Sequence, residues 1–236
     1  MGTYSIYCKR IGYSNVVLIA NGKQSVLIDT GVSGNMKKLR FLIRQAGLKP
    51  SDIKLIVLTH THYDHTGNLK KLYDYTQAKV VVHKNEFENL KGGFTPIPTG
   101  QGKYSGMLSE LGRKFYPTYA SPKPFTADFI NHDEFELQAF GIDGKLISTP
   151  GHTMGSQSLV LGGNLIAGDT FLNLKNGRIF PPFANNPAVL LQTWEKLFKY
   201  DINLVYPGHG NPFMIEKAFS DFERWKKKLE DRRVSM

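Results

Sequence analysis

The sequence predicts an α/β fold in which two mixed β-sheets pack face to face and helices cover their outer faces. Three two-residue turn signals lie beside apolar runs and indicate antiparallel hairpins: Asn21-Gly22, Asp143-Gly144 and Gly162-Gly163. The runs beside these turns are apolar on consecutive residues instead of alternating, so both faces of each sheet are expected to be covered. Amphipathic segments elsewhere in the chain would provide that cover.

The expected strands and helices follow from these signals in chain order. Strands are predicted at residues 16–19, 25–28, 55–58, 145–147, 159–161, 165–166 and 204–206. A first helix keeps apolar residues at helical spacing over residues 36–46 and stops at Gly47. A second begins after Asn186 at Pro187 and runs to residue 199, and a last amphipathic stripe covers residues 215–229.

Residues 91–125 do not continue this series of predicted strands and helices, because they are rich in glycine, proline and aromatic side chains. A structureless stretch of this length inside a domain is usually functional, so we predict a lid insertion here. The alternative is a peripheral insertion that packs its own small cluster. A second aromatic loop at residues 179–183 is expected to form the opposite wall of a site.

Length, cysteine content and charge narrow the class of protein. The 236 residues favour one domain over residues 1–236, and the single Cys8 cannot form an internal disulfide. No secretory leader or membrane-spanning apolar run is visible, which predicts a soluble, cytoplasmic protein. The net charge of +10 favours an anionic small molecule. A nucleic-acid substrate is disfavoured, because the basic residues mainly follow solvated helix faces. The oligomeric state is not predicted.

The densest chemical signal is His60-Thr61-His62-Tyr63-Asp64-His65, which places four metal-binding side chains within six residues after an apolar run. Imidazole and carboxylate ligands suit zinc and its neighbours in the first transition row. A site without thiolate can keep a coordination position for water, as catalytic sites do. The motif therefore predicts a catalytic metal centre.

Three further turns repeat one design, in which an apolar strand ends at a glycine that is followed by one polar side chain. They present His152, Asp169 and His209. Glycine allows a sharp turn and a close approach of the backbone to an ion. His83 and His132 lie outside this pattern and are interpreted as structural.

The order of these motifs resembles the metallo-β-lactamase superfamily, whose H-x-H-x-D-H motif is followed by separate His, Asp and His turns. The resemblance spans residues 24–210 and implies a four-layer αβ/βα sandwich. It also implies that Asp29 hydrogen-bonds the ligand loop. The ligand sets it implies are, for one metal, His60, His62 and His152; for the second, Asp64, His65 and His209; and, bridging both, Asp169.

The resemblance implies a binuclear hydrolase of the glyoxalase II-like branch, without the glutathione-binding extension. A metal-bound hydroxide would attack an ester, thioester or lactone, and Asp64 would orient it and shuttle its proton. Two divalent ions are expected, with zinc favoured over iron or manganese. β-Lactam hydrolysis is disfavoured, because true β-lactamases of the superfamily generally lack the aspartate found here as Asp169.

Three other functions stay open at this point. A phosphodiesterase or nuclease would use the same metals, and a mononuclear iron persulfide dioxygenase shares the H-x-H-x-D-H motif. A noncatalytic binding protein is disfavoured because no ligand is missing. For a small-molecule substrate, the candidate contact residues are Tyr63, Phe94, Tyr104, Tyr119, Lys175, Arg178 and Phe180.

Overall fold

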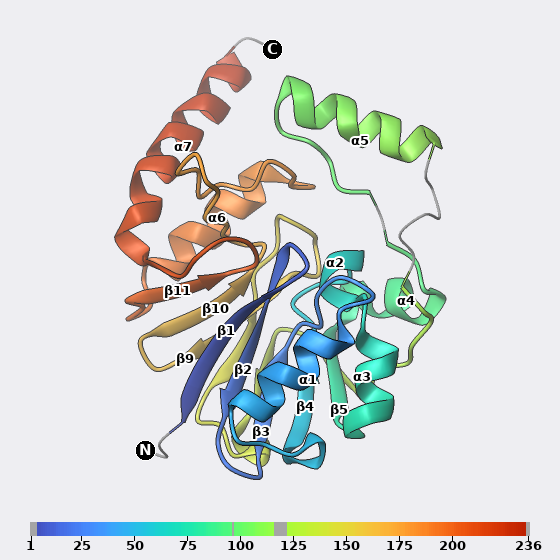
Figure 1. Cartoon of the computed structure of the whole chain (residues 1–236). Coiled ribbons are helices and arrows are strands. Elements are labelled where there is room, and N and C mark those ends of the chain that lie inside the picture. Colours follow the sequence, from blue (N-terminus) through green and yellow to red (C-terminus); the bar gives the residue numbers. More distant parts are fainter. Residues whose placement is uncertain (1–3, 96, 116–121, 235–236) are drawn as a thin grey trace.

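The computed structural model describes residues 4–95, 97–115 and 122–234. Two six-stranded sheets lie at its centre, and helices lie outside them (Figure 1). Within these described ranges, no helix has the length and apolar character needed to cross a membrane.

The first sheet has the order β1-β2-β3-β4-β5-β6 and is antiparallel from β1 to β3 and parallel from β3 to β6. The predicted hairpin at Asn21-Gly22 joins β2 to β3, with residues 21–24 as its connection. The strands are β1 (Ser5–Ile11), β2 (Ser14–Ala20), β3 (Ser25–Ile28), β4 (Ile53–Val57), β5 (Lys79–His83) and β6 (Phe129–Asn131).

The second sheet has the order β12-β11-β10-β9-β8-β7, and β10 and β11 form its parallel pair. Gly162-Gly163 forms the predicted two-residue link between β9 and β10. The two-residue hairpin expected at Asp143-Gly144 is wrong, because a longer loop containing a 3₁₀ turn joins β7 to β8. The strands are β7 (Glu134–Glu136), β8 (Lys145–Ser148), β9 (Gln157–Leu161), β10 (Asn164–Gly168), β11 (Leu204–Pro207) and β12 (Phe213–Met214).

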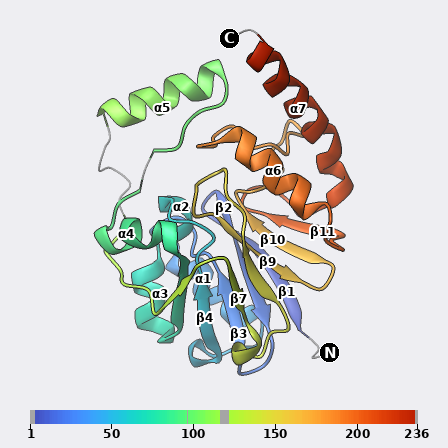
Figure 2. The ribbon, with the colours of Figure 1, turned by 180° about the vertical axis from the view of Figure 1, so that it is seen from behind.

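Helices flank both sheets (Figure 2). The predicted start of α6 is confirmed, since the Asn186 side chain accepts a hydrogen bond of 3.1 Å from the Val189 N–H. The helices are α1 (Met36–Gln45), α2 (Tyr63–Thr66), α3 (Leu69–Thr76), α4 (Lys84–Gly92), α5 (Lys103–Phe115), α6 (Pro187–Leu197) and α7 (Phe219–Val234). The 3₁₀ turns are η1 (Pro50–Asp52), η2 (Gln138–Phe140) and η3 (Ile215–Ala218).

Strand β2 is apolar without interruption from Val16 to Ala20, because side chains on both of its faces are packed. Val16 and Leu18 pack in a cluster with the α1 residue Leu39, whereas Val17 and Ile19 pack in a cluster with residues of the second sheet. A third cluster lies between the second sheet and the helices α6 and α7. The predicted sandwich of two covered sheets is therefore confirmed, with four layers.

The described parts of residues 91–125 are more regular than the sequence suggested. They contain α5, which lies beside one end of the sandwich and is set apart from it (Figure 1). The segment before α5 pairs with the second aromatic loop: Gly100 and Phe183 form a β-bridge, and the Gln101 N–H donates to the Pro182 carbonyl at 2.8 Å. The two loops thus contact each other directly.

Candidate metal centre

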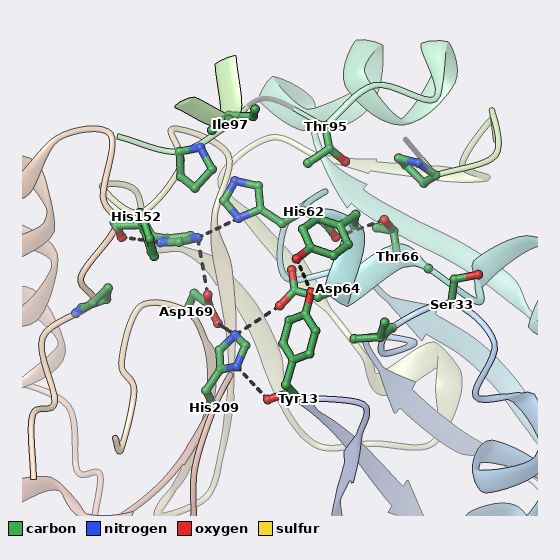
Figure 3. A pocket seen from close by; sticks show the side chains of 18 of the residues that line it. Tyr13, Ser33, His62, Asp64, Thr66, Thr95, Ile97, His152, Asp169 and His209 are labelled. Atoms are coloured by element: carbon green, nitrogen blue, oxygen red, sulfur yellow. Dashed lines mark hydrogen bonds and ion pairs between the residues drawn. The ribbon is translucent and has the colours of Figure 1, made fainter. Parts of the chain in front are cut away.

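Four strand ends meet at one edge of the sandwich and bring the predicted ligands together (Figure 3). The loop after β4 carries His60 and His62, and the first turn of α2 carries Asp64 and His65. The remaining ligands follow β8, β10 and β11 and are His152, Asp169 and His209. Residues about 150 positions apart in the chain therefore line one small space.

The first ligand group consists of three histidines, His60, His62 and His152, whose facing ring nitrogens all lie within 4.8 Å of one another. Nδ1 of His62 lies 3.0 Å from Nε2 of His60 and 3.0 Å from Nε2 of His152. All three side chains are buried. We call this set the trihistidine group.

The second group consists of Asp64, His65 and His209, which we call the mixed group. The Oδ2 atom of Asp64 lies 3.3 Å from Nε2 of His209 and 3.6 Å from Nε2 of His65. His65 is fully buried, but the His209 side chain is 19% exposed. The mixed group is therefore the more open of the two.

Asp169 lies between the two groups and turns one carboxylate oxygen toward each. Its Oδ2 atom is 3.5 Å from Nε2 of His152 in the trihistidine group. Its Oδ1 atom is 3.3 Å from Nε2 of His65 and 3.4 Å from Nε2 of His209 in the mixed group. A carboxylate in this position can bind two cations at once.

Hydrogen bonds on the outer ring nitrogens define the tautomers of four histidines. Nδ1 of His152 lies 2.9 Å from the Phe183 carbonyl, and Nδ1 of His209 lies 2.8 Å from the Tyr13 carbonyl. A carbonyl only accepts, so each Nδ1 carries a proton and Nε2 is the ring nitrogen that faces the centre. His60 and His65 follow the same rule through Thr59 and Asp29.

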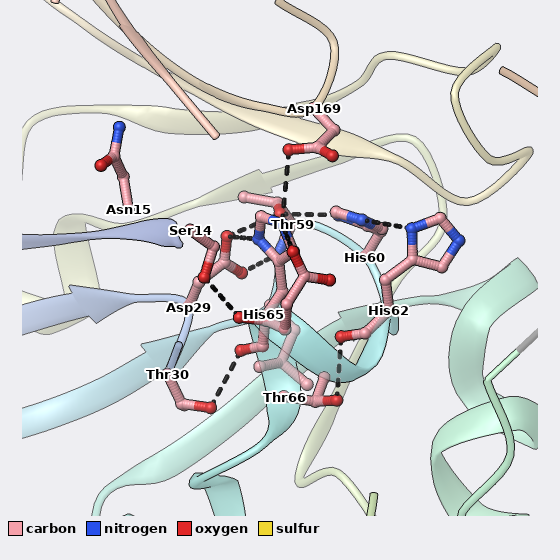
Figure 4. A network of polar contacts seen from close by, with 12 residues as sticks. Ser14, Asn15, Asp29, Thr30, Thr59, His60, His62, His65, Thr66 and Asp169 are labelled. Atoms are coloured by element: carbon pink, nitrogen blue, oxygen red, sulfur yellow. Dashed lines mark hydrogen bonds and ion pairs between the residues drawn. The ribbon is translucent and has the colours of Figure 1, made fainter. Parts of the chain in front are cut away.

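Asp29 connects these two histidines, as the resemblance led us to expect (Figure 4). Its carboxylate accepts bonds of 2.8 Å from both the N–H and the hydroxyl of Thr59 and of 2.7 Å from Nδ1 of His65. Since the Thr59 hydroxyl donates to Asp29, its oxygen is left to accept from Nδ1 of His60 at 3.0 Å. Asp29 has a backbone φ of 62°, which is rare outside glycine and is typical of functional positions.

Two supporting residues were missed by the sequence analysis. Glu86 on α4 is 3% exposed, and its carboxylate accepts from both the N–H and the hydroxyl of Thr61, the residue between His60 and His62. Asn15 on β2 donates to the carbonyls of Pro207 and Gly210 at 2.9 and 2.7 Å, which holds the turn that carries His209. Neither residue lies in a motif, so only the fold reveals these contacts.

The electrostatics of the two groups differ. Burial, reinforced by neighbouring histidines, lowers the pKa of His62 to about 3, and burial also lowers the pKa of His60 and His152. Burial acts to lower the pKa of His209 too, but Asp169 and Asp64 outweigh it and raise that pKa to about 10. The trihistidine group is thus uncharged, whereas the electrostatics of the mixed group are dominated by the carboxylates of Asp64 and the neighbouring Asp169.

The donor set fits divalent cations. In the trihistidine group, ring nitrogens of His60 and His152 lie within hydrogen-bonding distance of a ring nitrogen of His62, and all three rings are uncharged. His60 and His152 already donate their ring proton to an outer acceptor. Nε2 of His65 and Oδ1 of Asp169 are buried and have no hydrogen-bond partner among the described residues. Buried polar atoms rarely stay unpaired, and a bound metal ion would supply a partner for both.

A cavity of about 1110 Å³ opens above the centre, and His62, Asp64, His152, Asp169 and His209 form part of its floor. Among the predicted substrate contacts, Tyr63 lines this cavity. The other described candidates lie outside its lining, and they are Phe94, Tyr104, Lys175, Arg178 and Phe180. Tyr119 lies outside the described residues.

Phe180 is absent from the lining because it belongs to the core. It is 0% exposed and stacks on Trp225 with ring centroids 4.0 Å apart. Phe183, three residues later, lines the cavity in its place. Tyr13, which the sequence analysis also missed, lines the cavity and donates a hydrogen bond to the Tyr63 hydroxyl. Its position beside Ser14 and Asn15 at the start of β2 carried no recognisable signal.

Comparison with known proteins agrees with this geometry. The family model of the metallo-beta-lactamase superfamily matches residues 10–209. A probable metallo-hydrolase of Methanocaldococcus jannaschii is 32% identical over 204 residues, which cover 84% of this chain and 89% of that protein. The chain therefore belongs to the metallo-β-lactamase superfamily, and the prediction of a metallo-hydrolase is confirmed at the level of this family.

Structural similarity supports the same fold. The crystal structure of a metallo-beta-lactamase family protein from Thermus thermophilus has a TM-score of 0.71 at 22% identity, covering 98% of this chain and 82% of that one. A hydroxyacylglutathione hydrolase of Shewanella baltica is 29% identical over 143 residues, 60% of this chain and 41% of that protein. This partial match supports the glyoxalase II-like branch only weakly.

Proposed function

We propose that this protein is a binuclear metallohydrolase that cleaves an ester, thioester or lactone bond in a small molecule. The observation that carries the proposal is the orientation of Asp169, whose two carboxylate oxygens face two different ligand groups within 3.5 Å. A protein that used one ion would need only the trihistidine group. The complete mixed group therefore favours two ions.

The trihistidine group would hold one cation, the mixed group the other, and Asp169 both. Two divalent cations, with zinc favoured and iron or manganese as alternatives, would activate a water molecule and polarise the substrate carbonyl. Asp64 lines the cavity with its carboxylate, so it can orient the attacking water and accept its proton. The outer hydrogen bonds on His60, His65, His152 and His209 keep four ring nitrogens aimed at the centre.

The cavity favours a carbonyl substrate over a nucleic acid. Much of its wall is apolar and is formed by leucine, isoleucine, proline and phenylalanine side chains from residues 97–112 and 172–183. A phosphodiester polyanion would need cationic groups along most of its length. A small molecule with an apolar part suits these walls better.

The test combines metal analysis with a substrate panel. Protein purified without added metal should contain close to two ions per chain after metal loading. It should hydrolyse an aryl ester or a lactone faster than a phosphodiester reporter. One ion per chain with oxygen uptake on a persulfide would contradict the proposal in favour of a dioxygenase. Faster phosphodiester cleavage would contradict it in favour of a nuclease.

A further inference from the structure

We infer that the substrate is amphiphilic: an ester or thioester that joins an apolar acyl chain to a group carrying a carboxylate or phosphate. This inference rests on the proposed hydrolase function and adds the substrate class. It follows from the distribution of side chains around the cavity, which is apolar on one side of the metal centre and cationic on the other.

The apolar side is formed by two segments that pair with each other. Phe183 follows Pro181 and Pro182, and its carbonyl holds His152, so this wall begins directly at the trihistidine group. Leu172 and Leu174 continue it. The loop before α5 and the inner face of α5 add Ile97, Pro98 and Leu108. An acyl chain placed here would be shielded from water along its length.

The cationic side lies beyond Asp64, next to Ser33 and Thr66 (Figure 3). Lys71 lies on α3, the helix that follows Thr66 in the chain, and Lys123 also lines the cavity; neither forms an ion pair within the described part of the chain. Their neighbour Lys70 differs, because it pairs with Asp74 at 2.5 Å. Lys71 and Lys123 are therefore free to bind an anionic group of the substrate.

The metal centre lies between these two sides, since His152 and Asp64 flank it in the cavity floor (Figure 3). A substrate that spans the cavity would place its apolar chain over Phe183 and its anionic group near Lys71. The bond between the two parts would then lie above the ligands. The cavity volume of about 1110 Å³ is large enough for such a molecule.

The first experiment measures the acyl preference with 4-acyloxybenzamide esters of increasing chain length. For the metal-loaded protein, kcat/KM should rise at least about tenfold from acetyl to hexanoyl, since each methylene loses contact with water. Leu108→Asn should reduce this rise severalfold. Leu111→Asn is the matched control, because Leu111 lies on the same helix, is 44% exposed and does not line the cavity. Equal rates for acetyl and hexanoyl esters would overturn the apolar half of the inference.

The second experiment measures the charge preference with hexanoyl esters of 4-hydroxybenzoate, 4-hydroxyphenyl phosphate and neutral 4-hydroxybenzamide. The anionic esters should have the lower KM, and whichever anion is preferred identifies the group. Lys71→Met and Lys123→Met should each reduce the preference for the anionic esters over the neutral ester about two- to fivefold. Lys38→Met, an exposed lysine of α1 outside the cavity, should have no effect. An equal loss in Lys38→Met, or no anionic preference, would overturn the inference.

A binding measurement separates failure of this inference from failure of the proposed function. The ether 4-hexyloxybenzoate cannot be hydrolysed, so calorimetry reports its affinity whether or not the protein is a hydrolase. It should bind more tightly than 4-hexyloxybenzamide, and Lys71→Met should remove part of the difference. A carboxylate that binds only to the metal ions would be insensitive to this substitution, and that result would contradict a role for Lys71. Tight, lysine-dependent binding without hydrolysis would instead refute only the proposed function.

Discussion

The trihistidine and mixed groups share one sheet edge but differ in burial, charge and support. The trihistidine group is buried and uncharged, and Glu86 on α4 and the Phe183 carbonyl hold it in place. The mixed group contains Asp64, and its most exposed member, His209, is held by the β1–β2 turn through the Tyr13 carbonyl. Asp29 supports both groups, but these other contacts come from separate elements, so each group should be separable from the other by substitution.

The difference in burial and charge also suggests that the two groups have different roles in catalysis. An uncharged, buried set of imidazoles can hold a cation without further rearrangement, which suits a fixed structural and Lewis-acid role. The mixed group has a carboxylate that lines the cavity, so it is better placed to handle the proton of the attacking water. Substitutions in each group and in the residues that support it would test this division.

The largest effect should come from removing one histidine of each group. His209→Ala should lower metal content from about two ions to one, because the trihistidine group and Asp169 stay intact. His152→Ala should instead empty the first site. Both variants should lose nearly all hydrolysis. Metal analysis after dialysis and cobalt absorption spectra, which differ between three-nitrogen and mixed ligand sets, would distinguish them. If both variants lose both ions together, the two groups are not independent.

Asp64→Asn should have the next largest effect. The amide keeps nearly the same shape and one coordinating oxygen, but it removes the negative charge that orients water and accepts a proton. The rate at saturating metal should fall by about 10² to 10⁴. Metal must be titrated to saturation, because the affinity of the mixed group should also weaken. Asp201→Asn, an exposed aspartate far from the motif, is the control. A wild-type rate in Asp64→Asn would require another mechanism.

A smaller effect is expected from the residues that support each group. Glu86→Gln should weaken the first metal and leave the second unchanged, because its carboxylate accepts hydrogen bonds from the Thr61 N–H and hydroxyl, in the loop of the trihistidine group. Asp29→Asn should weaken both, because it bonds Thr59 and His65. Losses of this kind are typically about 10- to 100-fold in metal affinity. Competition with a chromogenic chelator measures the dissociation constants of the two metal sites. Equal losses at both sites in Glu86→Gln would show that Glu86 only stabilises the fold.

The ligands were predictable from the sequence because each lies in a local pattern. The cluster from His60 to His65 is continuous, and His152, Asp169 and His209 each follow an apolar strand that ends at glycine. The two covered sheets were predictable for a similar reason, since uninterrupted apolar strands need cover on both faces.

The supporting and cavity residues could not be predicted in the same way. Glu86 acts on Thr61 across 25 positions, and a single carboxylate on a helix has no distinguishing pattern. Phe180 and Phe183 are separated by two prolines, and only packing against Trp194 and Trp225 decides which ring is buried. Helix α5 was missed because glycines and prolines surround it, although Tyr104, Met107, Leu108 and Leu111 keep helical spacing.

The smallest effect should come from the roof of the cavity, which contacts the residue between His60 and His62. The Thr95 hydroxyl donates to the Thr61 carbonyl at 3.0 Å, whereas α5 begins eight residues later and, among its described side chains, contributes Leu108, Ser109 and Gly112 to the cavity lining. Replacing residues 103–114 with a short Gly-Ser linker should therefore leave folding and both metal ions intact. It should raise KM for hexanoyl esters about three- to tenfold and leave acetyl esters nearly unchanged, because α5 shields only the far part of the acyl chain. Thr95→Val serves as the comparison, since it breaks the contact with Thr61 and should lower metal affinity without changing the acyl preference. Loss of folded, metal-loaded protein in the linker variant would show that α5 belongs to the core instead of a lid.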